Sequence, residues 1–149
     1  MIKILKSSEK KEIVRSLEAN YGVSELPYLL LETGKYKIRG FSGDLNSDEL
    51  MGVMKLARVE VIGMYLLNRE KQGFRISLDG SHALKSQLTK QIIELNEEDA
   101  HAYMQGKEVE KEVLQGIVMA KSGPDFLGWA LSSGKRLPNF FPKERRIKA

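Results

Sequence analysis

The fold is decided by residues 116–131, which read GIVMAKSGPDFLGWAL. Residues 116–120 and 126–131 are two apolar segments of strand length. Between them stands Ser122-Gly123-Pro124-Asp125, a group of residues typical of a tight turn. The stretch therefore predicts a β-hairpin, around which the rest of the C-terminal part must be arranged.

Further short strands are predicted upstream of this hairpin. Residues 58–67 and 74–78 carry alternating apolar side chains on the two sides of a polar turn, and residues 90–95 form another short strand. Asn96 is placed to cap a helix of about two turns, which Gly106 ends. Many short strands at roughly ten-residue spacing, interrupted by one short helix, favour a small β-barrel over parallel βαβ units.

The N-terminal part has a different pattern. Apolar residues at helical spacing predict a helix over residues 7–21, with Ser7 and Ser8 able to cap it. Residues 28–31 and 35–41 predict two strands, and Asn46 begins a capping box for a second helix. The pattern changes near Ala57, where we expect a domain boundary. The predicted fold class is α+β.

Periodicity also predicts which side chains are buried and which are exposed. In residues 35–41, basic residues alternate with Tyr36 and Ile38, so that Lys35, Lys37 and Arg39 share one face of the strand. We expect the two parts to pack together, each around its own core. The residues expected in these cores are Ile13, Leu17, Val53 and Met54 for the first, and Val61, Ile76, Val118 and Trp129 for the second.

Composition excludes several classes of protein and of chemistry. The chain has 149 residues, 42% of them hydrophobic, but no uninterrupted apolar run of the roughly 18 residues that a membrane helix needs. The first residues also lack the apolar segment of a signal peptide, so we expect a cytoplasmic protein. The absence of cysteine excludes disulfides, thiolate metal sites and a cysteine nucleophile, and two histidines are too few for a histidine-rich metal site. We therefore expect no metal and no cofactor.

The positive charge is concentrated at the C-terminal end. The sequence has 24 Lys plus Arg and 20 Asp plus Glu, a net charge of +4. Six of the basic residues lie from Lys135 onward, where Glu144 is the one acidic residue. Such a tail can be basic merely to stay solvated, but it also suits an anionic partner. Aromatic residues lie among these cations, and Trp129, Phe140 and Phe141 can either stack on bases or fill a barrel.

Two groups of residues could suggest an enzyme. Asp79, Ser81 and His82 lie within four residues, but a hydrolase triad needs its imidazole between nucleophile and acid, and no Gly-x-Ser-x-Gly motif is present. We expect Asp79-Gly80 to form a turn and His82 to pack with one ring nitrogen bonded, with a hydrolase using His82 as one alternative. His101 lies beside acidic residues that favour the first turn of a helix whether or not a metal is bound.

Six short motifs follow one another between residues 58 and 147. They are Gly73-Phe74-Arg75, Ser81-His82-Ala83-Leu84, Tyr103-Met104-Gln105-Gly106-Lys107, Gly128-Trp129, Gly134-Lys135-Arg136-Leu137 and Asn139-Phe140-Phe141-Pro142-Lys143. In order and spacing they resemble the PUA-like C-terminal domain of RsmF-type ribosomal RNA cytosine-5 methyltransferases. The sequence departs from that family at Ala130 and at Glu144, where the family usually has glycine.

The resemblance implies a PUA-like mixed β-barrel over residues 58–149, preceded by a small α/β pre-PUA domain over residues 1–57. The implied function is a stand-alone, non-catalytic RNA-binding protein that acts in rRNA or tRNA modification or in ribosome biogenesis. Its partner would be structured RNA and not a membrane, and an RNA-modifying enzyme supplied in trans is a second candidate partner. An alternative is a protein–protein adaptor for an RNA-modifying or ribosome-assembly factor, docking through the apolar residues around Phe140 and Phe141. The residues expected to contact RNA are Arg75, His82, Lys85, Lys135, Arg136, Asn139, Lys143, Arg145 and Arg146.

Overall fold

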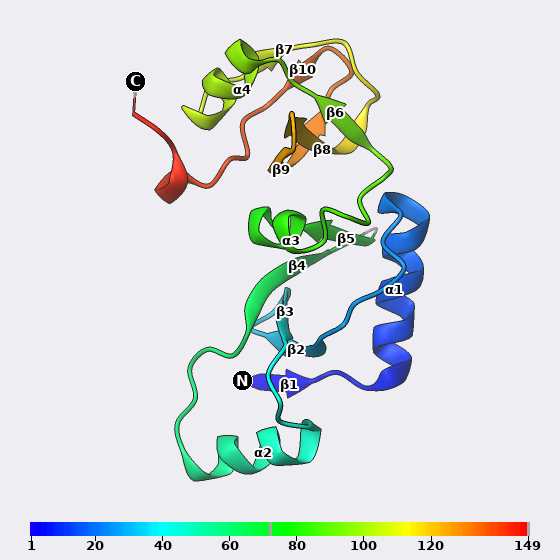
Figure 1. Cartoon of the computed structure of the whole chain (residues 1–149), viewed down its shortest axis with the longest axis vertical. Helices are drawn as coiled ribbons and strands as arrows, with labels where there is room; N and C mark the ends of the chain where they lie inside the picture. The colour runs from blue at the N-terminus through cyan, green and yellow to red at the C-terminus, as the bar shows by residue number, and fades with distance from the viewer. Residues whose placement is uncertain (72, 149) are drawn as a thin grey trace.

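The computed structural model describes residues 1–71 and 73–148 and shows an α+β architecture (Figure 1). The helices are α1 (Ser7–Tyr21), α2 (Ser47–Leu56), α3 (Leu78–Ala83), α4 (Glu97–Met104) and the short 3-10 helix η1 (Lys143–Arg145). The strands are β1 (Ile2–Ile4), β2 (Leu29–Thr33), β3 (Lys37–Phe41), β4 (Met64–Glu70), β5 (Gly73–Ile76), β6 (Ile92–Glu94), β7 (Val109–Glu110), β8 (Gly116–Ser122), β9 (Asp125–Ser132) and β10 (Arg136–Leu137).

A five-stranded antiparallel sheet in the order β1-β2-β3-β4-β5 forms the first layer. Helix α1 lies along one face of it, where Ile13 and Leu17 are buried against Leu30 and Ile38. Helix α2 covers part of the other face, where Leu50 packs into a smaller core. The sheet alternates its side chains between these two cores, as a period of two residues requires.

The two longer helices begin and end where local chemistry permits. The Lys6 N–H donates to the Glu9 carboxylate at 2.8 Å, so Lys6 caps α1, in place of the expected Ser7 and Ser8. Gly22 ends the helix in the left-handed region with φ 84°, which glycine adopts without steric cost. Asn46 caps α2 as predicted, since its side chain accepts from the Glu49 N–H at 2.9 Å.

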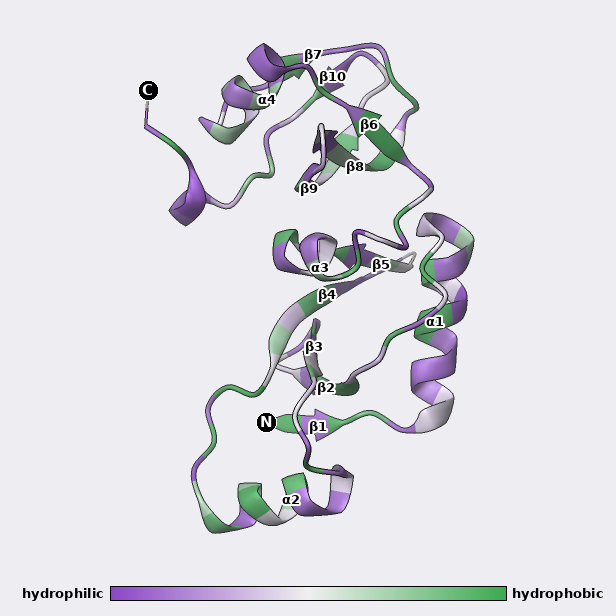
Figure 2. Ribbon diagram, viewed as in Figure 1, coloured by the Kyte–Doolittle hydropathy of each residue, from purple (hydrophilic) through white to green (hydrophobic). Residues whose placement is uncertain are grey.

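A three-stranded sheet, β6-β8-β9, lies between the first layer and the group formed by α4 and the β7-β10 pair (Figure 1). Strands β8 and β9 form the predicted hairpin, while β6 runs parallel to β8. Met119 faces the core beneath α1, whereas Val118 and Leu127 face a second core under α4. Tyr103 of α4 fills that second core, and the short pair β7-β10 lies beside it. Figure 2 shows the contrast between the hydrophobic β6, in green, and the hydrophilic η1, in purple.

The structure corrects several predictions in the middle of the chain. Residues 58–63 are not a strand, because β4 begins only at Met64. Val53 and Val61, expected in the cores, are 42% and 66% exposed. Asp79-Gly80 is not a turn but lies in α3, because the Ser77 side chain accepts from the Gly80 N–H and caps a helix there. Ile76 and Val118 are buried as predicted, and Trp129 is half-buried.

The loop that begins at Ala57 connects α2 to β4. Strand β4, which follows this loop, pairs with β3, which precedes α2. The first sheet therefore contains strands from both sides of Ala57, and a domain boundary at that residue stays a prediction. Among residues 1–71 and 73–148, none of the helices is both long and apolar enough to cross a membrane.

Candidate nucleic-acid interface

Three side chains from both sheets and the C-terminal segment form one stack. The guanidinium carbon of Arg75, on β5, lies 4.1 Å from the centre of the Trp129 ring, on β9. The centres of the Trp129 and Phe140 rings are 4.2 Å apart, with an angle of 31° between the planes. Two flat groups this close cannot share one ring face, so Trp129 lies between Arg75 and Phe140. Phe140 is 39% exposed and forms the outer end of the stack.

Helix α3 and η1 bring a second group of predicted residues together. Arg145 donates to the Asp79 carboxylate at 2.7 Å, which joins the basic tail to α3. His82, one turn along α3 from Asp79, has its Nε2 2.8 Å from the carbonyl oxygen of Phe126. That carbonyl can only accept, so Nε2 carries the proton, and one ring nitrogen is bonded as predicted.

Asn139 and Arg146 make contacts within the protein. The Asn139 amide nitrogen donates to the carbonyl oxygens of Tyr103 at 2.6 Å and Lys107 at 2.9 Å. Its oxygen accepts from the Phe141 N–H and from Arg146. Arg146 also donates to the Phe141 carbonyl at 3.3 Å. Both residues therefore hold the C-terminal segment against α4. The Asn139 amide and part of the Arg146 guanidinium, which were expected to contact RNA, are already engaged in these hydrogen bonds.

The other predicted cations differ in whether they have an acidic partner. Arg136 pairs with Glu108 at 3.4 Å and with Glu110 at 3.8 Å, at the β7-β10 pair. Lys85, Lys135 and Lys143 are exposed and form no ion pair within residues 1–71 and 73–148. These lysines are thus the cations that an anionic ligand reaches with no internal ion pair to break.

The three side chains that could suggest a hydrolase have separate partners. Ser81 is buried and donates to the Leu78 carbonyl at 2.6 Å. Asp79 is paired with Arg145, and His82 is bonded to the Phe126 carbonyl. No hydrogen bond connects any two of the three, so the arrangement lacks the relay of a catalytic triad. In the described part of the chain, no three His, Cys, Asp or Glu residues come together as a metal site.

Burial changes the acidity of two tyrosines near the interface. Burial raises the pKa of Tyr103 to about 12, against the smaller opposing effects of the Phe140 N–H and the Arg146 charge. Burial also raises the pKa of Tyr21 to about 12, with the nearby Arg75 charge opposing it. Both phenols are therefore neutral hydrogen-bonding groups at neutral pH, and the Tyr21 hydroxyl donates to the Phe74 carbonyl at 2.8 Å.

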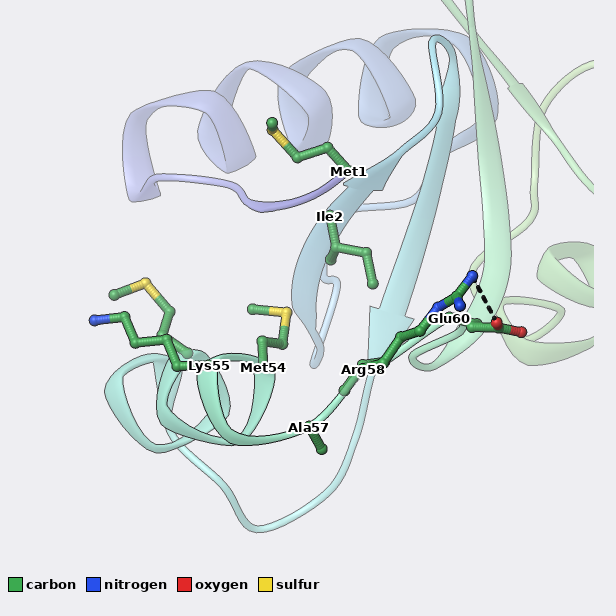
Figure 3. Close-up of a pocket in the computed structure, with 9 residues that line it drawn as sticks. Met1, Ile2, Met54, Lys55, Ala57, Arg58 and Glu60 are labelled. Carbon is green, nitrogen blue, oxygen red and sulfur yellow. Dashed lines mark ion pairs between the residues drawn. The ribbon is translucent and has the colours of Figure 1, made fainter.

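A cavity of about 700 Å³ lies elsewhere, between α2, β1 and the residues that follow α2 (Figure 3). Met1, Ile2 and Met54 line its apolar side. Its charged residues include Arg58 and Glu60, which pair with each other at 3.3 Å (Figure 3). None of the residues predicted to contact RNA lines this cavity.

The prediction of site residues missed the neighbours of Arg75 on the first sheet. In the strand register, Lys37 lies opposite Asn68, and Asn68 lies opposite Arg75. Glu70 pairs with Arg75 at 3.0 Å. The alternation of basic residues in residues 35–41 was a signal for this surface, but the pairing that places Lys37 in one row with Arg75 is not visible in the sequence.

Most of the C-terminal part of the chain matches a known protein family. Residues 90–147 match the family described as the methyltransferase RsmF PUA domain. Over 143 residues, the chain is 26% identical to the ribosomal RNA small subunit methyltransferase F of Aeromonas salmonicida (strain A449). This match covers 94% of the present chain and 28% of that protein. The chain thus spans little more than a quarter of the length of this curated relative.

A solved structure supports the fold over the whole chain. The crystal structure of a hypothetical protein from the hyperthermophilic archaeon Pyrococcus horikoshii OT3 is similar with a TM-score of 0.60, at 12% sequence identity and with 100% of both chains covered. At this identity the similarity concerns the fold alone. The resemblance found in the sequence is confirmed by the family match, which covers residues 90–147 of this chain.

Proposed function

We propose that this protein is a non-catalytic RNA-binding module that acts in ribosomal RNA modification. The observation that carries the proposal is the match of residues 90–147 to the PUA domain of the methyltransferase RsmF, a region that contains Trp129, Phe140 and most of the basic tail. The similar protein from Aeromonas salmonicida is named as a ribosomal RNA methyltransferase. The match concerns its PUA domain, which fits a binding role for the present chain.

The proposed architecture is a PUA-like barrel preceded by a smaller α/β part. In this proposal the β6-β8-β9 sheet, the β7-β10 pair and α4 belong to the barrel. The stack of Arg75, Trp129 and Phe140 lies where the barrel meets the first sheet. This position would allow an RNA strand to contact both parts of the chain.

The chemistry of the stack suits an unpaired nucleotide. Phe140 presents a partly exposed aromatic ring that is already supported from behind by Trp129, so stacking a base on it requires little ordering of side chains. Lys143 is exposed three residues later in the chain and forms no ion pair in the described residues, so it is available to a phosphate. RNA recognition commonly combines such aromatic stacking with cations that hold the backbone.

The test is a titration of labelled RNA, followed by fluorescence anisotropy over a series of salt concentrations. The probes are a ribosomal RNA hairpin with a single-stranded loop and a duplex of the same sequence without the loop. We expect the hairpin to bind more tightly, with an affinity that falls steeply as salt rises because phosphate contacts release counterions. Phe140→Ala should weaken hairpin binding and leave the salt slope unchanged, since it removes stacking and no charge.

The outcome also decides between RNA and a protein partner. An adaptor that docks through Phe140 would bind its partner through apolar contacts, and neither RNA probe would bind in a salt-dependent manner. Absence of saturable binding to both probes at low salt would overturn the proposed function.

A further inference from the structure

We propose that the face of the first sheet turned away from α1 is a second RNA-binding surface, which takes a single-stranded segment continuing from the stack at Phe140. The residues that form it are Lys35, Lys37, Arg39, Tyr36, Tyr65 and Arg75. The inference rests on the proposed RNA-binding function and names the path and the kind of RNA.

The strand register places Lys37, Arg39, Tyr65 and Arg75 on one face, and Lys35 and Tyr36 lie in the turn that precedes β3. Lys37, Asn68 and Arg75 lie opposite one another across β3, β4 and β5. Directly opposed residues of antiparallel strands point to the same side of the sheet. The same register places Arg39 opposite Tyr65. Adjacent strands are about 4.8 Å apart, so the row from Lys37 to Arg75 spans about 10 Å.

The opposite face belongs to the core and is not available. Ile38, between Lys37 and Arg39 in β3, is fully buried beneath α1. Because side chains alternate along a strand, the burial of Ile38 turns its two basic neighbours to the other side. Helix α2 covers that other side only around Leu31 and Ile62, so it leaves the end near β5 to the basic residues.

The basic face keeps its charge because the acidic residues near it are already paired. Lys35 and Lys37 are exposed and form no ion pair within the described residues. Of the acidic residues, Glu60 pairs with Arg58 at 3.3 Å. Glu70 pairs with Arg75 at 3.0 Å and accepts from the Asn68 amide at 2.8 Å. An anionic ligand therefore meets unpaired lysine charge on this face.

Aromatic rings lie directly beside these cations. The Lys35 ammonium is 5.1 Å from the centre of the Tyr36 ring, and the Lys37 ammonium is 5.4 Å from that of Tyr65. Tyr36 is 46% exposed and helps to line a hollow of about 380 Å³ together with Lys35, Lys37 and Asn68. Rings for stacking next to cations for phosphates are the combination that binds single-stranded nucleic acid, whose bases are free to stack.

Arg75 makes this face continuous with the first interface. Its guanidinium lies in the row with Lys37 and also against the ring of Trp129, which stacks on Phe140. A strand bound at Phe140 can therefore pass over Trp129 and Arg75, whose charge is paired with Glu70, to reach Tyr65 and the unpaired Lys37. This continuity favours one RNA strand over an acidic protein as the ligand.

The experiment compares two charge-matched double variants of the full chain. The test variant is Lys35→Gln with Lys37→Gln, and the control is Lys11→Gln with Lys55→Gln, two exposed lysines on α1 and α2. The probes are unstructured single-stranded RNAs of about 4 and about 16 nucleotides, the range of site sizes of single small domains. Binding is measured by fluorescence anisotropy over a salt series.

For the long RNA we expect the slope of log affinity against log salt to become shallower by about 1.4 in the test variant, at roughly 0.7 per phosphate contact. The control should match the wild type, and the short RNA, which Phe140 and its neighbours can hold alone, should be much less affected. Tyr65→Leu should weaken binding of the long RNA by about tenfold with the slope unchanged, whereas Tyr65→Phe should restore it because the ring is kept.

The two proposals fail in different ways. If the wild type binds RNA but the test variant and the control give equal slopes and affinities on the long RNA, the second surface is overturned, as it would be if the face served an acidic protein. If the wild type binds none of the RNAs, the RNA-binding function itself is overturned.

Discussion

The guanidinium of Arg75 lies 4.1 Å from the centre of the Trp129 ring, and this contact joins the two sheets of the molecule. Arg75 comes from β5 of the first sheet and Trp129 from β9 of the second. Only 25% of the Arg75 side chain is exposed, and its charge is balanced by Glu70 at 3.0 Å. A cation held against an indole and partly removed from water stabilises the fold by about 1 kcal/mol. The Arg75–Trp129 pair therefore connects the two sheets and also supports Phe140 in the proposed interface.

Replacing Trp129 tests this double role. Trp129→Ala removes a half-buried ring that packs on the main core between Arg75 and Phe140. We expect a loss of about 3 kcal/mol in the free energy of unfolding, measured by urea denaturation. Trp129→Phe keeps an aromatic ring in the stack and should lose less. A loss below about 1 kcal/mol for the alanine variant would mean that the ring is only a surface platform.

The elements that the sequence predicts best are those whose signals are local. The hairpin was predicted because Gly123 and Pro124 stand between two apolar segments, and both strands and turn are in the structure. The helix capped by Asn46 was predicted from the Asn46–Glu49 spacing, and the reciprocal hydrogen bonds are present. Such signals need only a few neighbouring residues to be correct.

The parts that the sequence does not predict depend on distant partners. Val53 has the spacing of a core residue but is exposed, because α2 covers the sheet with Leu50 and Met54 instead. The charges of Arg136 and Arg145 read alike in the sequence, yet one pairs with Glu108 and the other with Asp79. These ion pairs determine which cations of the tail are free to bind a ligand. The ion pairs depend on the fold, and the local sequence pattern does not predict them.

Asn139 was predicted to contact RNA, and its contacts within the protein lead to a different expectation. Asn139→Ala leaves the carbonyls of Tyr103 and Lys107 and the Phe141 N–H without their partner. We expect a loss of about 2 kcal/mol or more in the free energy of unfolding, because partly buried polar groups lose their hydrogen bonds. Asn20→Ala is the control: it removes one exposed bond to Ser16, and its effect should stay within about 0.5 kcal/mol. Equal stabilities of the two variants would contradict the role assigned to Asn139.

The two buried tyrosines predict a loss of stability at alkaline pH. Burial raises the pKa of Tyr21 and of Tyr103 to about 12 in the folded protein, above the ordinary tyrosine value of 10.0. Between these two values the unfolded chain has lost phenolic protons that the folded chain keeps, so stability is complete below about pH 10 and falls as pH rises toward 12. The slope should approach about 1.4 kcal/mol per pH unit for each tyrosine.

Urea denaturation between about pH 9 and pH 12 measures this slope. Tyr103→Phe should reduce it, although the variant also loses the hydrogen bond to the Trp129 carbonyl at 3.3 Å. Tyr36→Phe, at an exposed position, is the control and should leave the slope unchanged. A slope that is the same in all three proteins would show that the buried Tyr103 phenol does not resist ionisation.

The chain as given should not bind S-adenosylmethionine. It has no cysteine, and its glycines do not form the Gly-x-Gly-x-x-Gly motif before a helix that holds a nucleotide cofactor. Calorimetry of the purified protein with the cofactor should give only heats of dilution, both alone and with RNA present. Saturable binding of the cofactor would contradict the proposal that this protein is a non-catalytic RNA-binding module.

The exposed Lys85, just after α3, and Lys143 of the tail should set the salt dependence of RNA binding. Lys85 and Lys143 form no ion pair within residues 1–71 and 73–148, in contrast to Arg145, which is paired with Asp79. Substituting both lysines with glutamine should make the slope of log affinity against log salt shallower by about 1.4, since each phosphate contact on a single strand contributes roughly 0.7. The weakening should be similar for different RNA sequences, because phosphate contacts position a strand without reading its bases. The Lys11 and Lys55 double variant carries the same change in net charge away from this surface and should keep the wild-type slope. If both double variants lowered the slope equally, the effect would come from net charge alone, and the tail would be only a solvated end of the chain.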